Sequence, residues 1–196
     1  FIREILKVAA NPEIISFAGG LPNPHLFPVK AIEQACQDVL REQGAAALQY
    51  ATTEGFAPLR QFIADRYLSR HGMTVNPDNI LITSGSQQAL DLLGKVLVNE
   101  GQDLIIEEPG YLGAIQAFSV YQPNFKPITL AEEGLDLAAL DALLEQGSSA
   151  RLLYGVPNFQ NPSGVSYSRA NREALAERLV RHDLLMVEDD PYGGVR

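Results

Sequence analysis

The 196-residue chain carries a formal net charge of −9 at pH 7, with 24 acidic residues against 15 lysines and arginines. This balance argues against a nucleic-acid-binding surface, which needs a basic patch to contact phosphates. With 46% hydrophobic residues the chain can bury one sizeable core, and no apolar run approaches the roughly 20 residues needed to cross a bilayer, so we expect no membrane partner.

Cysteine and histidine usage gives no sign of a disulfide or a metal site. The single cysteine, Cys36, lies in a predicted helix, so we expect a buried apolar thiol in a reducing cytoplasm. The three histidines, His25, His71 and His182, are scattered and lack the spacing of metal ligands. We therefore predict a cytoplasmic protein without a metal site.

Up to residue 72 the sequence predicts helices joined by irregular loops. Two adjacent glycines, Gly19 and Gly20, permit either a simple turn or a close approach of the backbone to a ligand. Gly44 and Gly72 follow apolar residues at helical spacing and predict helix ends. The predicted elements are a helix over 1–8, a short strand over 14–17, and helices over 29–42 and 56–71.

From residue 79 onward, strand-like and helix-like segments alternate. The predicted strands cover 79–83, 103–107, 126–130, 151–156 and 184–188, and the predicted helices cover 88–98, 112–120, 136–146 and 168–182. Asp136 and Ser168 are expected to cap the last two helices. The alternation predicts an α/β fold of three layers, with a mainly parallel sheet between helices on both faces.

Polar residues follow several of these strands at their carboxyl ends, which is the edge where open α/β sheets bind ligands. The turn Ser84-Gly85-Ser86-Gln87 precedes a helix, whose free backbone N–H groups attract an anion such as phosphate. The same turn could serve only as a helix cap, and it is neither a P-loop nor a dinucleotide fingerprint. Tyr111, after the next strand, could stack on a planar ligand or simply cover the sheet edge.

Two further strand ends carry an amide and a pair of acids. Asn161 lies in a turn, where it could bond a ligand oxygen or have only a turn role. Asp189 and Asp190 either cap the turn before Pro191 or present a carboxylate to a ligand, with Tyr192 adding a phenol. Together, an anion site, an aromatic face, an amide, a carboxylate and a phenol at one edge suit a planar, phosphorylated heterocycle with a basic ring nitrogen.

The motifs resemble those of class I/II, fold-type I aminotransferases that depend on pyridoxal 5′-phosphate, with the α-aminoadipate/kynurenine branch as the nearest subgroup. The resemblance spans nearly the whole chain. Its segments are residues 16–22, 49–55, 83–90, 108–111, 157–164 and 188–193.

The resemblance implies a role for each matching residue. For the cofactor, Gly85, Ser86 and Gln87 match the phosphate-binding turn, and Tyr111 matches the residue that stacks on the ring. Asn161 and Tyr192 match the pair that bonds the ring 3-oxygen. Asp189 matches the carboxylate that pairs with the ring nitrogen. Asp189 is preferred to Asp190 because the family places this acid three residues before the tyrosine. Tyr50 matches a tyrosine that reaches the neighbouring subunit's phosphate in a homodimer, and Gly20 matches a loop residue near the substrate carboxylate.

The implied reaction is the transfer of an amino group between an amino acid and a 2-oxo acid. The implied domains are an N-terminal arm or small-domain segment over 1–28 and a cofactor-binding large domain over 29–196, truncated at its end. In the family, a lysine forms a Schiff base with the cofactor, and none of the four lysines matches its setting: Lys7, Lys30, Lys95 and Lys126. We expect that lysine beyond Arg196, together with the arginine that binds the substrate. We therefore expect the chain to be inactive by itself. An aminotransferase-like domain of a transcriptional regulator that senses pyridoxal phosphate, and a decarboxylase or lyase on the same fold, are alternatives.

Overall fold

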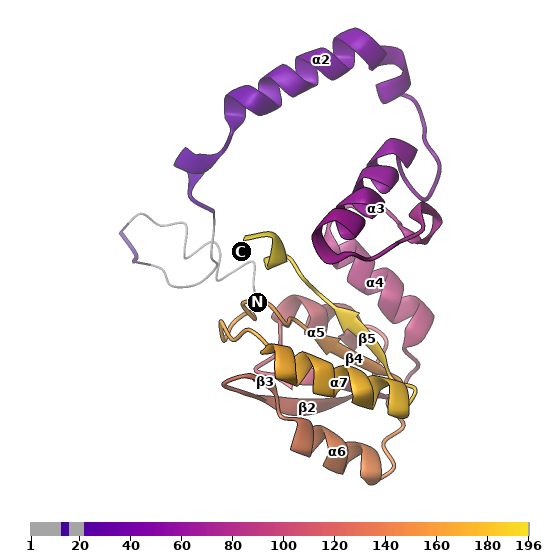
Figure 1. The fold of residues 1–196 in the computed structure, drawn as a ribbon, viewed down its shortest axis with the longest axis vertical. Coiled ribbons are helices and arrows are strands. Elements are labelled where there is room, and N and C mark those ends of the chain that lie inside the picture. Colours follow the sequence, from indigo (N-terminus) through magenta and orange to yellow (C-terminus); the bar gives the residue numbers. More distant parts are fainter. Residues whose placement is uncertain (1–12, 16–21, 196) are drawn as a thin grey trace. The chain divides into compact units, whose positions relative to one another are not determined.

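The computed structural model describes residues 13–15 and 22–195, which divide into two units, Phe1–Thr53 and Glu54–Arg196 (Figure 1). The helix predicted over 1–8 and the candidate Gly20 lie outside the described residues. The strand predicted over 14–17 is described only at Ile14 and Ile15, and neither is in a strand. The domain boundary expected after residue 28 stays a prediction.

The first unit contains a short 3-10 helix, η1 (Pro24–Leu26), and the long helix α2 (Val29–Ala47). The helix does not end at Gly44 as predicted; it kinks at Gln43, where φ is −136°, and continues for one more turn. No residue of α2 is buried, and Cys36 is exposed. The expectation of a buried thiol is therefore wrong, because helical spacing identifies an apolar face without identifying a partner that covers it.

The second unit is an α/β unit whose sheet has the strand order β3-β2-β1-β4-β5. All strand pairs are parallel except β2 with β3. The elements are α3 (Ala57–His71), η2 (Pro77–Asn79), α4 (Ser86–Leu97), β1 (Asp103–Glu108), α5 (Leu112–Ser119), β2 (Asn124–Ala131), β3 (Gly134–Leu135), α6 (Leu137–Glu145), β4 (Leu152–Gly155), α7 (Arg169–Arg181), β5 (Leu185–Glu188) and η3 (Gly193–Val195).

Helices cover both faces of this sheet (Figure 1). A separate apolar core lies on each face. Leu104 and Ile106 of β1 pack with α4 and α5, whereas Ile105 between them packs with α6 and α7. Successive residues of a strand point to opposite faces, so a fully apolar strand is covered on both sides. The predicted three-layer α/β fold with a mainly parallel sheet is confirmed.

Helix boundaries follow local signals. The Asp136 carboxylate accepts hydrogen bonds from the backbone N–H groups of Ala138 and Ala139, both at 3.0 Å, at the start of α6. The Ser168 hydroxyl accepts one from Asn171 N–H at 3.1 Å at the start of α7. Among the described helices, none is both long and apolar enough to cross a bilayer.

One predicted strand is wrong. Residues 80–83 form neither helix nor strand, and Leu81 is 51% exposed. Ile80 N–H donates to the Pro77 carbonyl at 3.1 Å, and Ile82 N–H donates to the Glu54 carbonyl at 3.0 Å, so neither bond goes to a strand. An apolar run becomes a strand only when another strand pairs with it, and the described sheet ends at β5 without reaching this segment. Conversely, β3 was missed because two residues are too few to show alternation.

Candidate functional site

A cavity of about 120 Å³ is lined by the candidate residues Ser86, Tyr111, Asn161, Asp189 and Tyr192, together with Val156 and Pro191. These residues follow β1, β4 and β5 or begin α4, so the cavity lies at the carboxyl edge of the sheet. Its volume is comparable with cavities of roughly 150 Å³ that hold a benzene ring in other proteins. A larger hollow of about 1130 Å³ contains none of the candidates and lies near the amino ends of the strands.

Asp189 is oriented by a buried tyrosine of the neighbouring strand. The Tyr154 hydroxyl donates a 2.7 Å hydrogen bond to Asp189 Oδ2, and the Asp189 backbone N–H donates to the Gly155 carbonyl at 2.9 Å. Burial, and then the bond to Asp189, raise the pKa of Tyr154, so its hydroxyl stays protonated and acts as a donor. Tyr154 lies within β4, so the pattern of polar residues that follow strands did not identify it.

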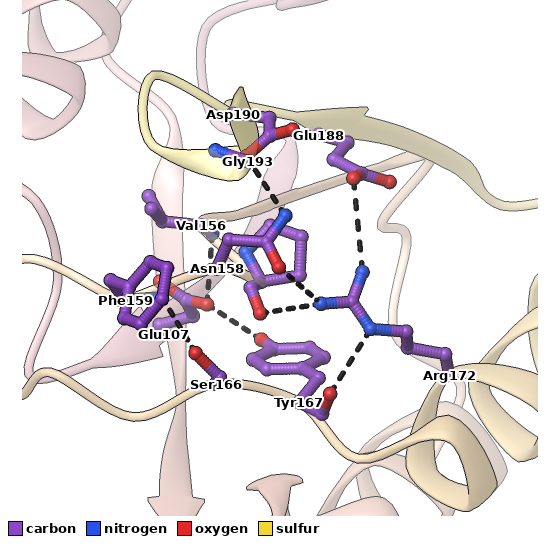
Figure 2. A network of polar contacts seen from close by, with 11 residues as sticks. Glu107, Val156, Asn158, Phe159, Ser166, Tyr167, Arg172, Glu188, Asp190 and Gly193 are labelled. Atoms are coloured by element: carbon purple, nitrogen blue, oxygen red, sulfur yellow. Dashed lines mark hydrogen bonds and ion pairs between the residues drawn. The ribbon is translucent and has the colours of Figure 1, made fainter. Parts of the chain in front are cut away.

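Asp190 has different partners. Its Oδ1 accepts hydrogen bonds from Asn158 Nδ2 and from Gly193 N–H, each at 2.8 Å (Figure 2). Asp190 does not line the cavity. The two roles considered for the acidic pair are therefore divided between its members. Asp190 caps the turn, and Asp189 faces the cavity.

The helix α4 begins at Ser86, two residues earlier than predicted, and Gly85 occupies the N-cap position with φ 85°. Gly85 has no side chain that could accept a hydrogen bond from the first-turn N–H groups, which suits an anion at this helix end. The Gln87 side chain donates to the Gly113 carbonyl at 3.3 Å and is not part of the cavity wall. Gln87 would therefore serve an anion through its backbone.

Tyr111 occupies the N-cap position of α5 and is half-buried against the core on the α4/α5 face. A Cβ atom at Gly113 would lie 2.7 Å from atoms of the Tyr111 ring, so glycine at 113 allows the ring its position. The ring both covers part of the sheet edge and lines the cavity. Gly85 and Gln87, on either side of Ser86, are not part of the cavity lining. Tyr50 belongs to the first unit and is 99% exposed, and Gly20 lies outside the described residues.

A buried carboxylate, Glu107, lies at the end of β1 and was missed by the sequence-based search. It is 1% exposed, and its oxygens accept hydrogen bonds from the Tyr167 hydroxyl and Val156 N–H (Figure 2). They also accept one from Gln160 Nε2. Burial raises the pKa of Glu107, the three hydrogen bonds oppose that rise, and the charge of Asp189 adds to it. An acid at the carboxyl end of an apolar strand was the signal that had identified Asp189, and Glu107 carries the same signal.

Arg172 of α7 also hydrogen-bonds the loop after β4. Its guanidinium donates to the Pro157 carbonyl at 2.7 Å, to Asn158 Oδ1 at 2.9 Å and to the Tyr167 carbonyl at 3.1 Å. Because Asn158 also bonds Asp190, the loop after β4 and the loop after β5 are joined (Figure 2). Within the described part of the chain, no cluster of three or more metal-ligating side chains occurs.

The model of the family described as aminotransferase class I and II matches residues 14–195. Aromatic-amino-acid aminotransferase 1 of Thermococcus litoralis is 43% identical, with the match covering 100% of this chain and 48% of the relative. The 2-aminoadipate transaminase of Thermus thermophilus is 47% identical, covering 97% of this chain and 46% of the relative. A solved structure of Pyrococcus horikoshii kynurenine aminotransferase in complex with PMP has a TM-score of 0.92 at 43% identity, covering 100% of this chain and 49% of that one. The chain thus spans about half the length of the relatives it matches.

Proposed function

Because the chain belongs to the class I and II aminotransferase family, we propose that the complete protein transfers an amino group between an amino acid and a 2-oxo acid, with pyridoxal 5′-phosphate as cofactor. The observation that carries this proposal is the cavity at the sheet edge, where Ser86, Tyr111, Asn161, Asp189 and Tyr192 meet. These residues come from four separate segments of the sequence, and each offers a group that the cofactor requires.

The residues present fit this cofactor. The first turn of α4 offers backbone N–H groups to a phosphate, and Tyr111 offers an aromatic face to a planar ring. Asn161 and Tyr192 supply hydrogen-bond donors for a ring oxygen, and Asp189 supplies a carboxylate for a ring nitrogen. When bound, the cofactor supplies an electron sink for the electrons left when a substrate α-proton departs.

The contribution of Asp189 is electrostatic. Two opposite charges about 4 Å apart gain on the order of 4 kcal/mol at an effective dielectric near 20, enough to keep a pyridine-type nitrogen protonated. The Tyr154 hydroxyl fixes the direction of the carboxylate, so little reorganisation is needed when the ring enters.

The names of the relatives suggest which substrates to test. Their names point to aromatic amino acids, 2-aminoadipate and kynurenine as the first amino donors to test. We include in the proposal a homodimer, in which Tyr50 reaches the neighbouring subunit's phosphate and Gly20 lies near the substrate carboxylate. The 99% exposure of Tyr50 supports this role, because a residue that serves another subunit cannot be buried in its own. A cytoplasmic location, expected from the lone Cys36, belongs to the same proposal.

A second candidate function rests on one relative. An uncharacterised HTH-type transcriptional regulator, YdcR of Escherichia coli, is 31% identical over 98% of this chain and 41% of its own length. A regulator would keep the cofactor cavity and add DNA binding. Transaminase turnover without specific DNA binding by the complete protein supports the enzyme, and the reverse result supports the regulator.

The two neighbouring aspartates provide the test. In the complete protein, Asp189→Ala should reduce transamination kcat/KM by roughly 1000-fold, because about 4 kcal/mol of charge stabilisation is lost. Asp190→Ala should cost much less, since Asp190 bonds Asn158 and Gly193 rather than facing the cavity. Steady-state kinetics and absorbance of the bound cofactor measure both effects. Equal losses in the two variants would contradict the assignment of Asp189.

A further inference from the structure

The buried carboxylate of Glu107 is directed toward one loop. All three of its hydrogen bonds go to residues from 156 to 167. Oε1 accepts from Val156 N–H at 2.9 Å and from the Tyr167 hydroxyl at 2.6 Å (Figure 2). Oε2 accepts from Gln160 Nε2 at 3.1 Å. Val156 lines the cavity, and Glu107 does not. Glu107 therefore acts on the loop that forms the cavity wall.

Gln160 carries this connection to the turn that holds Asn161. Its Nε2 also donates to the Pro109 carbonyl at 2.7 Å, and its Oε1 accepts from Ser163 N–H at 2.8 Å and from the Ser163 hydroxyl at 2.6 Å. The side chain is 1% exposed and uses both ends of its amide. Asn161 lies between Gln160 and Ser163, so the turn that presents it is held on both sides.

Removing one partner from such a buried hydrogen-bond network destabilises the local structure. A buried donor left without an acceptor costs its full desolvation, and Glu107 and Gln160 are each only 1% exposed. The amide of Asn161, by contrast, is exposed, and no hydrogen bond from its side chain is recorded within the described residues. Its direction therefore depends on the backbone of the turn.

We propose that Glu107 is a positioning residue that acts through Gln160: it fixes the turn from Gln160 to Ser163 so that Asn161 faces the cavity and holds the cofactor's ring oxygen. This inference rests on the proposed function, since it names Asn161 as a contact of pyridoxal phosphate. Glu107 touches neither cofactor nor substrate, and its effect is transmitted by the Gln160 amide.

The substitution Glu107→Gln breaks one link of this network selectively. Val156 and Tyr167 both donate to Oε1, so the oxygen of the new amide takes that position and keeps both bonds. The new amide nitrogen then replaces Oε2 and faces the Gln160 Nε2 group, which leaves two donors opposed. Gln160 cannot turn over to resolve this, because its ends are held by Pro109 and Ser163.

The test is a double-mutant cycle in the complete protein, with pyridoxamine phosphate as the probe because it binds without a covalent bond. We expect Glu107→Gln and Asn161→Ala each to raise the dissociation constant of this probe about 10-fold. The dissociation constant of the double variant should lie within about 2-fold of that of Asn161→Ala alone. Hydrogen exchange of peptides covering 156–164 should become faster in Glu107→Gln. Asp141→Asn, which removes an acid bonded to Arg178 between α6 and α7, should change neither readout and controls for general destabilisation.

The outcomes separate the possibilities. Multiplicative losses near 100-fold in the double variant, or unchanged exchange over 156–164, overturn the positioning role. If Glu107→Gln does not fold, Gln160→Ala takes its place, because it cuts the same link and should show the same coupling with Asn161→Ala. A wild-type protein that does not bind pyridoxamine phosphate refutes the proposed function, whereas the exchange measurement still decides whether Glu107 holds the turn.

Discussion

Two tyrosine–aspartate hydrogen bonds show how the surroundings of a residue determine its role. Tyr154 donates to Asp189 at 2.7 Å beside the cavity, and Tyr121 donates to Asp91 at 2.8 Å on the surface near α4 and α5. The chemistry of the pair is the same in both places. Only the first pair lies where a ligand could sense the direction of the carboxylate.

Tyr154→Phe should therefore lower kcat/KM of the complete protein about 10-fold, because Asp189 loses the bond that orients it. Tyr121→Phe removes a bond of similar length away from the cavity and should leave kcat/KM unchanged. Steady-state kinetics with each purified variant compares them. The orienting role of Tyr154 is refuted if the two variants have the same activity.

At the scale of elements, the helices α6 and α7 are joined by one bidentate ion pair. Arg178 Nε and Nη2 donate to the two carboxylate oxygens of Asp141 at 2.8 and 2.7 Å. The hydrogen bond from Arg178 is the main cause that lowers the pKa of Asp141. Because the folded state holds this carboxylate ionised, the pair contributes stability above the ordinary aspartate range, and that stability is lost as pH falls through the lowered pKa.

Asp141→Asn should reduce the free energy of unfolding by about 1 kcal/mol at pH 7, the upper range for a partly exposed pair. The difference from the wild type should shrink as pH falls below about 4 and vanish once Asp141 is protonated in both states. Urea denaturation of both proteins between pH 3 and pH 7 measures the difference. A difference independent of pH would show that the pair contributes through packing rather than charge.

At the scale of the whole molecule, the positions of the lysines bear on catalysis. Within the described part of the second unit, neither Lys95 nor Lys126 lines the cavity. Lys95 is in the last turn of α4, nine residues beyond the end that meets the cavity, or roughly 13 Å along the helix. Lys126, on β2, lies 3.5 Å from Asp103, at the opposite end of β1 from Glu107.

We therefore expect the 196-residue chain to show no transaminase turnover and no stoichiometric borohydride-trapped adduct with pyridoxal phosphate. Covalent binding needs an amine at the cavity, and these positions do not supply one. Mass spectrometry after reduction measures the adduct, with the complete protein as the positive control. A stoichiometric adduct at any of the four lysines would contradict this prediction.

Local signals allowed the order of elements and most helix ends to be predicted, because caps and apolar periods depend on residues a few positions apart. Asp136 and Ser168 cap their helices as predicted, and Gly72 ends α3. The strand predicted over 79–83 and the buried state of Cys36 were wrong because both depend on a partner element, which no local pattern specifies.

The sequence by itself determined the family, the α/β alternation and the residues that follow each strand. Only the tertiary structure decided that Asp189 faces the cavity while Asp190 caps a turn, and that Glu107 bonds Gln160, 53 residues away. The physical reason is that the position of a side chain at a strand end is set by pairing between strands, and burial and hydrogen bonding then bring together groups that the chain keeps far apart.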